Sequence, residues 1–374
     1  MAISASGPLI SAWAAVSPWG LDRRDFSSGL REARTTAAPL DRETWTLPRH
    51  EACLVPDFDI KQILGRKGTR SMDRATGLAV TALKQLLDDG GGGRLDGVGE
   101  DTGLALGTST GSAQSIMSFT RDSLTGAKPY FVDPARFPNT VMNCAAGQSA
   151  IWHRLKGPNT TVAGGRATGL LALRYALRLQ RAGRSDTVLC GAVEEFSAAR
   201  AWLDWHGRNG TPAEAEGENR PLGEGAAVWL IEPAEDMRRN ARTGLAEVLG
   251  LEFGFTPDTG DIPATLERCV STLLTRADIG AHDVWAVAAS TPPGRQGDAE
   301  QEALEKIFAR HEPRAVPCAD LIGDTYAASA AMQFGAVLSL AEGDDAAGRY
   351  ALITSAESGG TTGAALLKLR GAPR

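Results

Sequence analysis

The chain has 374 residues, of which 43% are hydrophobic and 22% are charged, and this is ordinary globular composition. Its formal net charge of −6 argues against a protein that binds nucleic acid or an anionic membrane surface. No apolar run approaches the ~20 residues needed to span a bilayer, and residues 1–20 lack the pattern of a signal peptide.

Strand-like and helix-like segments alternate along the first half of the chain. Residues 3–15 mix apolar and small side chains and lead into a turn at 17–20. There follow a helix over 71–87, a strand at 102–112 that runs into a Gly/Ser/Thr turn, a helix over 167–182, and strands over 186–195 and 226–233. The polar stretch 207–222 is expected to be an exposed loop.

The second half repeats this alternation. We expect a strand over 245–254, a helix over 262–276, a strand over 284–291, helices over 298–311 and 327–343, and two strands around a glycine turn within 349–369. The pattern predicts an α/β protein with mainly parallel or mixed sheets. The helix at 327–343 is rich in Ala and Gly, which suits burial between two sheets.

Five cysteines are scattered along the chain without a CxxC pair: Cys53, Cys144, Cys190, Cys269 and Cys318. This pattern favours reduced thiols in a cytoplasmic protein over a disulfide framework or a zinc site. Cys144 and Cys318 are conceivable nucleophiles, but free Cys usually behaves as a small buried hydrophobe.

Segment 157–195, which opens with GPNTTV, resembles the active-site segment of the β-ketoacyl synthases. Four further segments resemble other parts of that family in the same order: LALGTSTGS (104–112), FPNTVMNCAAG (137–147), PLGEGAAVWLIE (221–232) and ESGGTTGAALLKL (357–369). The resemblance implies the thiolase fold, an α/β fold of five αβαβα layers built from two similar βα halves, and a dimer. We expect the halves to span 1–235 and 236–374.

The residues that carry the family's chemistry are all replaced in this chain. The position of the nucleophilic Cys, at the start of a buried helix, holds Arg166. The resemblance places Ala289 and Asp324 at the two His positions. It places Ala319 at the Lys position and Ser358 at the Phe of the C-terminal glycine turn. None of the chain's own histidines lies at a family position: His50, His153, His206, His282 and His311.

An arginine at a helix N-terminus is electrostatically unfavourable and needs an anionic partner. In the family the nucleophile and the second His face each other. Their replacements therefore predict a buried ion pair between Arg166 and Asp324. The alternative is that Arg166 turns to solvent or to another acid, while Asp324 only caps the helix that follows it.

The turn GTSTGS at 107–112 lacks the Lys and the spacing of a P-loop, so we interpret it as a close-packed turn at the family's dimer interface. The stretch 112–119 that follows resembles the part of related subunits that shapes the tunnel for the growing acyl chain. Ser115, Met117 and Phe119 are therefore candidate tunnel residues, and ordinary helix core is the alternative.

The resemblance implies a chain length factor, the non-catalytic subunit of a ketosynthase heterodimer in a type II polyketide synthase. Such a subunit pairs with a catalytic ketosynthase, which condenses malonyl units on an acyl carrier protein, and it influences how long the polyketide grows. No cofactor, metal, nucleic acid or membrane partner is implied. Arg166 stands where chain length factors most often carry Gln, which leaves aromatic, reduced and polyene products open. Two other functions also remain open: an acyltransferase or hydrolase with a relocated nucleophile, and a stand-alone acyl-binding module.

Overall fold

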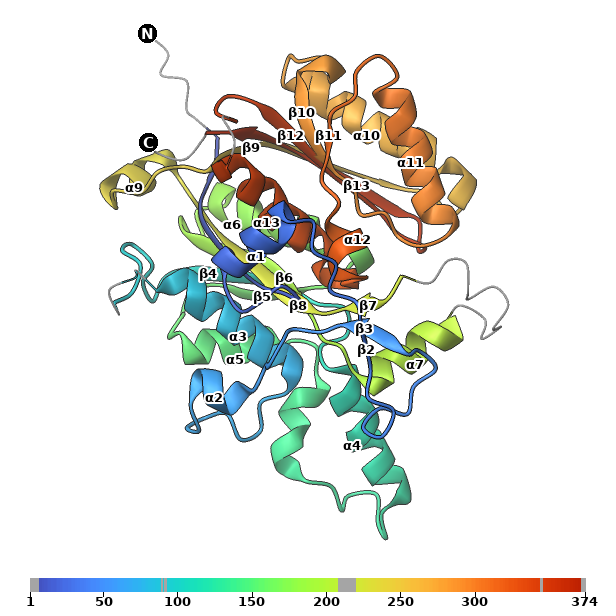
Figure 1. Cartoon of the computed structure of the whole chain (residues 1–374). Coiled ribbons are helices and arrows are strands. Elements are labelled where there is room, and N and C mark those ends of the chain that lie inside the picture. Colours follow the sequence, from blue (N-terminus) through green and yellow to red (C-terminus); the bar gives the residue numbers. More distant parts are fainter. Residues whose placement is uncertain (1–6, 89, 91–92, 208–219, 344–345, 371–374) are drawn as a thin grey trace.

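Ten strands form the scaffold of the molecule and lie in two layers (Figure 1). The computed structural model describes residues 7–88, 90, 93–207, 220–343 and 346–370. One layer has the strand order β1-β8-β6-β4-β5, and the other has the order β9-β13-β12-β10-β11. Strands β1 and β9 pair through Leu9–Glu247 and Ile10–Ala246 alone, so the layers are separate sheets over most of their width.

The two sheets have the same internal topology. The first contains β1 (Leu9–Val16), β4 (Gly103–Gly107), β5 (Asn159–Val162), β6 (Val188–Glu194) and β8 (Gly225–Glu232). The second contains β9 (Ala246–Phe255), β10 (Val284–Ala288), β11 (Arg314–Ala315), β12 (Tyr350–Ala356) and β13 (Thr361–Leu369). In each sheet three parallel strands are followed by two antiparallel ones. This repetition gives the two similar halves, and the boundary between them at residue 235 stays a prediction.

Helices fill the space between the sheets and cover both outer faces (Figure 1). Between the sheets lie α6 (Thr168–Arg181) and α13 (Ser329–Gly343). The first sheet is covered by α3 (Arg74–Leu87) and α5 (Cys144–Trp152), and the second by α10 (Ile262–Arg276) and α11 (Arg295–Ile307). This order confirms the predicted αβαβα layers. The other helices are α1 (Arg23–Arg31), α2 (Ile60–Leu64), α4 (Ala113–Thr125), α7 (Ala198–Gly207), α9 (Ala234–Arg239) and α12 (Cys318–Ile322).

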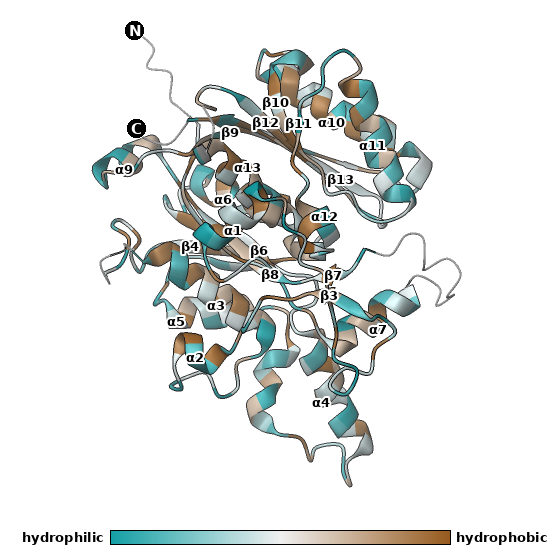
Figure 2. Ribbon diagram, viewed as in Figure 1, coloured by the Kyte–Doolittle hydropathy of each residue, from teal (hydrophilic) through white to brown (hydrophobic). Residues whose placement is uncertain are grey.

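The middle layer is held together by close contact between its two helices. A Cβ atom added to Gly169 of α6 would lie 2.7 Å from the backbone nitrogen of Ala331 of α13, so only glycine allows this approach. Apolar side chains surround the contact, and Trp229 of β8 packs on Phe334 of α13 with ring centroids 4.7 Å apart. Figure 2 shows apolar residues along α13 and the strands beside it. A small-residue helix between two sheets is what the sequence predicts.

Several predicted bounds differ from the structure. The helix expected over 298–311 begins earlier, at Arg295, because Gly294 ends the preceding turn with a φ of +79°. The strand expected over 284–291 ends at Ala288. Of the loop expected over 207–222, residues 208–219 lie outside the described residues. Its last residue belongs to β7 (Leu222–Gly223), which forms a small sheet with β2 (Ala38–Pro39) and β3 (Glu51–Cys53).

Candidate functional site

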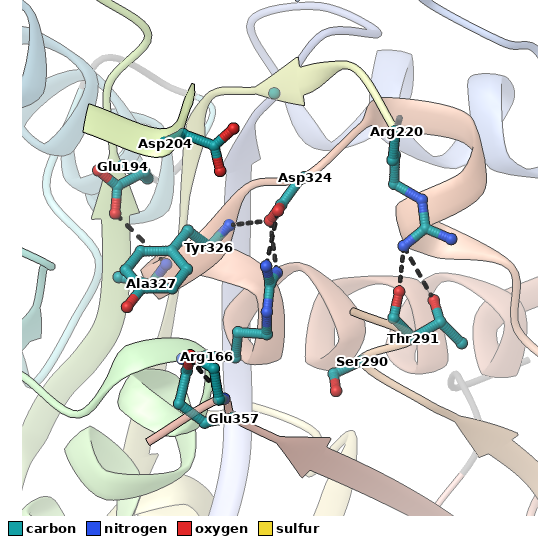
Figure 3. Close-up of polar contacts among 12 residues, drawn as sticks. Arg166, Glu194, Asp204, Arg220, Ser290, Thr291, Asp324, Tyr326, Ala327 and Glu357 are labelled. Atoms are coloured by element: carbon teal, nitrogen blue, oxygen red, sulfur yellow. Dashed lines mark hydrogen bonds and ion pairs between the residues drawn. The ribbon is translucent and has the colours of Figure 1, made fainter. Parts of the chain in front are cut away.

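A cavity of about 670 Å³ lies beside the start of α6. Its walls include three of the residues singled out in the sequence, Arg166, Asp324 and Ser358. They come from the head of α6, from the loop after α12 and from the turn between β12 and β13. The fold therefore brings these distant positions together, as Figure 3 shows for Arg166 and Asp324.

Arg166 belongs to a short 3-10 turn, η2 (Gly165–Ala167), that leads directly into α6. Its two terminal nitrogens donate to the two carboxylate oxygens of Asp324 at 2.5 and 2.6 Å. Arg166 is 7% exposed and Asp324 is 3% exposed. This bidentate, buried contact is the ion pair expected from the sequence, and the alternative of a solvent-facing Arg166 does not hold.

The charge state of the pair follows from its geometry. Burial alone would raise the pKa of Asp324, but the charge and the two hydrogen bonds of Arg166 hold that pKa well below its usual range. Burial likewise opposes ionisation of Arg166, and the charge of Asp324 keeps its pKa above the usual value. Both groups are therefore ionised at neutral pH.

Tyr326 lies beside the pair and fixes its position. The Asp324 carboxylate also accepts a hydrogen bond from the Tyr326 backbone nitrogen at 2.9 Å. The Arg166 guanidinium stands 5.3 Å from the centre of the Tyr326 ring, a cation–π distance. The backbone of Tyr326 has a φ of +41°, which is unusual for a residue with a side chain. Burial and the nearby charge of Glu357 raise the pKa of the Tyr326 hydroxyl to about 12, so it stays protonated.

A second buried arginine, Arg200 of α7, holds the backbone around the site. Its side chain donates to the carbonyl oxygens of Glu195 at 2.9 Å, Gly223 at 2.6 Å and Asp324 at 2.8 Å. It also lies 3.8 Å from the Glu194 carboxylate. Neither Arg200 nor Glu194 was singled out in the sequence. Arg200 binds carbonyl groups of distant Gly223 and Asp324. Glu194 accepts from the Ser109 hydroxyl and the Ala327 backbone nitrogen.

Glu357 is a further site residue that was not singled out in the sequence. It is 7% exposed, and its carboxylate accepts hydrogen bonds from the backbone nitrogens of Arg166 and Ser358, both at 2.8 Å. The Ser358 hydroxyl donates to the same carboxylate at 2.7 Å. Its only sequence signal is an acidic residue next to the glycine turn at 359–360.

Ala289 and Ala319 do not join this group. Ala289 follows β10 and packs against apolar residues between the second sheet and its outer helices. Ala319 lies in α12. Neither is among the described residues that line the cavity. A methyl group offers no acid or base in either place.

The cysteines offer no replacement nucleophile. All five are free and buried, and burial raises the pKa of each thiol. The pKa is about 11 for Cys144 and about 12 for Cys318, so both stay protonated at neutral pH. Within the described part of the chain, no cysteine or histidine lines the cavity.

The candidate tunnel residues lie on α4, whose first turn is well anchored. Ser112 caps α4 by accepting from the Ser115 backbone nitrogen at 3.1 Å. The buried Glu195 carboxylate accepts from the Ser112 hydroxyl at 3.1 Å and the Gln114 backbone nitrogen at 3.3 Å. The rest of α4 is not helix core, because Met117 is 52% exposed.

The other two tunnel candidates are partly covered. Ser115 lines a second cavity of about 650 Å³. Phe119 packs on Phe137, with ring centroids 5.9 Å apart. Their part in a tunnel stays a prediction.

The part of the chain that the structure describes shows neither a metal centre nor a membrane-spanning helix. No group of three or more His, Cys, Asp or Glu side chains there is placed to hold a metal ion. Nor does any helix in that part of the chain have the length and apolar content needed to cross a bilayer.

Residues 9–237 match the family model described as the N-terminal domain of β-ketoacyl synthase. The chain belongs to the β-ketoacyl synthase family. A chain of the ishigamide ketosynthase/chain length factor is 42% identical, with a TM-score of 0.89 over 98% of this chain and 100% of that one. Among curated relatives, 3-oxoacyl-(acyl-carrier-protein) synthase 2 of Rhizobium meliloti (strain 1021) is 28% identical over 71% of this chain and 69% of that protein.

More distant structures share the fold. One is a type II polyketide synthase acyl carrier protein in complex with its ketosynthase bound to the hexaketide, at 16% identity and a TM-score of 0.80. That match covers 98% of this chain and 100% of that chain. Another is a β-ketoacyl synthase from Burkholderia phymatum STM815, at 21% identity and a TM-score of 0.82 over 97% and 99% of the two chains. These matches confirm the predicted thiolase-like fold of the family.

Proposed function

We propose that this chain is a chain length factor, the non-catalytic subunit of a ketosynthase heterodimer. The observation that carries the proposal is the ion pair of Arg166 with Asp324 at the head of the buried helix α6. A guanidinium cannot carry an acyl group, and its carboxylate partner is already bound on both oxygens. The 42% identity to a chain of a ketosynthase/chain length factor supports the same assignment.

An exposed apolar surface supports the need for a partner subunit. Large apolar side chains lie exposed along residues 117–151, at Met117, Leu124, Tyr130, Phe131, Phe137, Val141, Met142 and Ile151. We call this set the 117–151 surface. The segments that carry these side chains contact one another, α4 with the 3-10 helix η1 (Pro134–Thr140) and η1 with α5, and exposed apolar side chains that gather in this way mark interaction sites. A partner that covers the 117–151 surface would enclose α4 and the cavity beside Ser115 between the two subunits.

This arrangement gives the non-catalytic subunit a role in the complex. The partner would supply the Cys and His groups for decarboxylative condensation of malonyl units on an acyl carrier protein. This chain would supply one wall of the acyl tunnel through Ser115, Met117 and Phe119, and so set the polyketide chain length. The five free cysteines suit a reducing compartment, and we place the complex in the cytoplasm.

Co-production tests the proposal. The tagged chain is produced alone and with each Cys-His-His ketosynthase of its source organism. We expect one of them to co-purify in equal amount, and the complex to extend malonyl units while the chain alone does not. A stable, well-folded homodimer that binds no ketosynthase would favour a stand-alone acyl-binding module instead.

A relocated nucleophile is tested on the isolated chain. Incubation with an acyl thioester, followed by intact mass measurement, should show no covalent adduct, because all five thiols are buried and protonated. An adduct formed at a rate fit for turnover would establish an acyltransferase or hydrolase.

A further inference from the structure

We propose that the Glu357 carboxylate fills an oxyanion cradle beside Arg166, a pair of backbone N–H groups that would otherwise bind the oxygen of a thioester carbonyl. The loss of the nucleophile at residue 166 is the first obstacle to acylation of this site, and the filled cradle is a second one. This inference rests on the proposed function and adds a residue to it. It predicts that restoring a thiol at position 166 is not enough to restore acylation.

The cradle consists of two backbone amides from opposite halves of the chain. The Arg166 nitrogen donates to one oxygen of Glu357, and the Ser358 nitrogen donates to the other, each at 2.8 Å. Backbone N–H groups that face one small region of space are the usual construction of an oxyanion hole in acyl-transfer enzymes, and these two face the two oxygens of a single carboxylate. Here one amide belongs to the residue at the nucleophile position, so a carbonyl attacked from that position would need the same space.

The local backbone is shaped for this carboxylate. Gly165 has a φ of +57°, in the left-handed region that favours glycine. A Cβ atom on Gly165 would lie 2.3 Å from a Glu357 carboxylate oxygen. The absence of a side chain at residue 165 is therefore what lets the carboxylate reach the Arg166 amide. Figure 3 shows Glu357 beside Arg166.

Asp324 and not Glu357 is the main counterion of Arg166, although the charge of Glu357 also favours the ionised guanidinium. Asp324 already binds both terminal nitrogens of that guanidinium. The hydrogen bond from Arg166 to Glu357 comes from its backbone and not from its side chain. The Glu357 carboxylate is thus held by the two amides that would otherwise stabilise a developing oxyanion, and also by the Ser358 hydroxyl.

The step that Glu357 blocks is simple thioester exchange. A thiolate at position 166 would attack the thioester carbonyl carbon and form a tetrahedral oxyanion. Collapse would break the old carbon–sulfur bond, leave the acyl group on the new sulfur and release the original thiolate, which takes up the proton that the attacking thiol lost to solvent when it ionised. With a carboxylate fixed in the cradle, the oxyanion would lose both donors and face a negative charge.

The test compares two chains that both carry a thiol at position 166. The first is Arg166→Cys/Asp324→Asn, in which the aspartate change avoids an unpaired buried charge. The second adds Glu357→Gly. Each is incubated with the N-acetylcysteamine thioester of octanoic acid, and the adduct is followed by mass. The rate is divided by the rate of alkylation of the same cysteine by iodoacetamide, which corrects for thiol access.

We expect the second chain to be acylated at least ~100-fold faster after this correction, the size of effect seen when an oxyanion donor is removed. Equal corrected rates in the two chains would overturn the inference.

A second measurement leaves the rest of the site intact and covers the case in which those variants do not fold. Glu357→Ala is compared with Glu235→Ala, a change at an exposed glutamate on α9. Hydrogen exchange at the amides of Arg166 and Ser358 should rise at least ~10-fold in the first chain only. Unchanged exchange would show that the carboxylate does not hold these amides. Neither outcome depends on binding a ketosynthase, so failure here is separate from failure of the proposed function.

Discussion

Arg166 and Asp324 lie 158 positions apart and meet in two parallel hydrogen bonds of 2.5 and 2.6 Å. The contact joins the head of α6, in the first half of the chain, to the loop that leads into α13, in the second half. A buried pair of this kind adds little net stability over apolar residues of the same shape, but removing one member leaves a charge without compensation.

Replacing one member of the pair should therefore destabilise the protein more than replacing both members. Asp324→Ala is expected to lower the free energy of unfolding by roughly 3–5 kcal/mol. The double variant Arg166→Met/Asp324→Leu should lose clearly less, because no buried charge remains. Urea unfolding of the three chains measures both values. A double variant as unstable as the single one would show that the polar contact itself stabilises the fold.

Glu195 should make stability depend on pH near neutrality. Burial, with the nearby charge of Asp73, raises the pKa of Glu195 to about 7. Because this folded-state pKa lies above the unfolded value of about 4.3, the native state binds the extra proton. The free energy of unfolding therefore falls as pH rises from about 4.3 to about 7. Above pH 7 it stays at the lowered value. Glu195→Gln should raise the free energy of unfolding at pH 8 by up to about 3 kcal/mol and much less at pH 5.

The pH series needs a matched control. Glu235→Gln changes an exposed glutamate and should shift stability little at either pH. Urea unfolding at pH 5 and pH 8 supplies the comparison. A Glu195→Gln effect of equal size at both values would mean that the carboxylate is ionised throughout this range.

Gly169 is expected to tolerate no side chain. The Cβ atom of Gly169→Ala would lie 2.7 Å from the Ala331 nitrogen and 3.1 Å from the Ala330 carbonyl carbon, which cannot move without shifting α13. We expect a loss of about 1–3 kcal/mol in the free energy of unfolding, as for other overpacked cores. Gly99→Ala, where nothing lies within 4 Å of the new atom, is the control. If both variants have the same melting temperature, the two helices are not in the close contact described.

Phe137 should be needed for partner binding. It is 58% exposed on the 117–151 surface and packs on Phe119. Phe137→Asp would bury a charge in the proposed interface, and we expect at least ~10-fold weaker binding to the ketosynthase. Phe255→Asp, which changes a 68% exposed residue on β9, should bind normally. Pull-down followed by titration measures both, and loss of binding in both variants would point to a different interface.

The fold and part of the site were accessible from the sequence for clear reasons. The helix over 262–276 was predicted with its true bounds, because its apolar residues recur at helical spacing. The Arg166–Asp324 contact was expected because a buried cation at a family position requires an anion. Glu357 and Arg200 are not predicted from the sequence because they bind mainly backbone groups. The order of residue types does not indicate which backbone amides and carbonyls from distant segments come together in the fold.

Segments with weak periodicity were also missed. The small sheet of β2, β3 and β7 has strands of two or three residues, too short to leave an alternating pattern. The sequence marks helix α4 only as a stretch that resembles other subunits. Ala113 is its one buried residue, so its apolar side chains do not form the buried stripe by which an amphipathic helix is predicted.

The apolar contact between Trp229 and Phe334 has a consequence for how the chain can be divided. The central hydrophobic cluster draws Leu170 and Trp229 from one half, and Phe334 and Ile353 from the other. Each half cut out alone would expose one side of that cluster to water, so the repeated topology does not make two autonomous folding units. Two fragments produced together should instead complement each other and assemble into the native molecule without a peptide link.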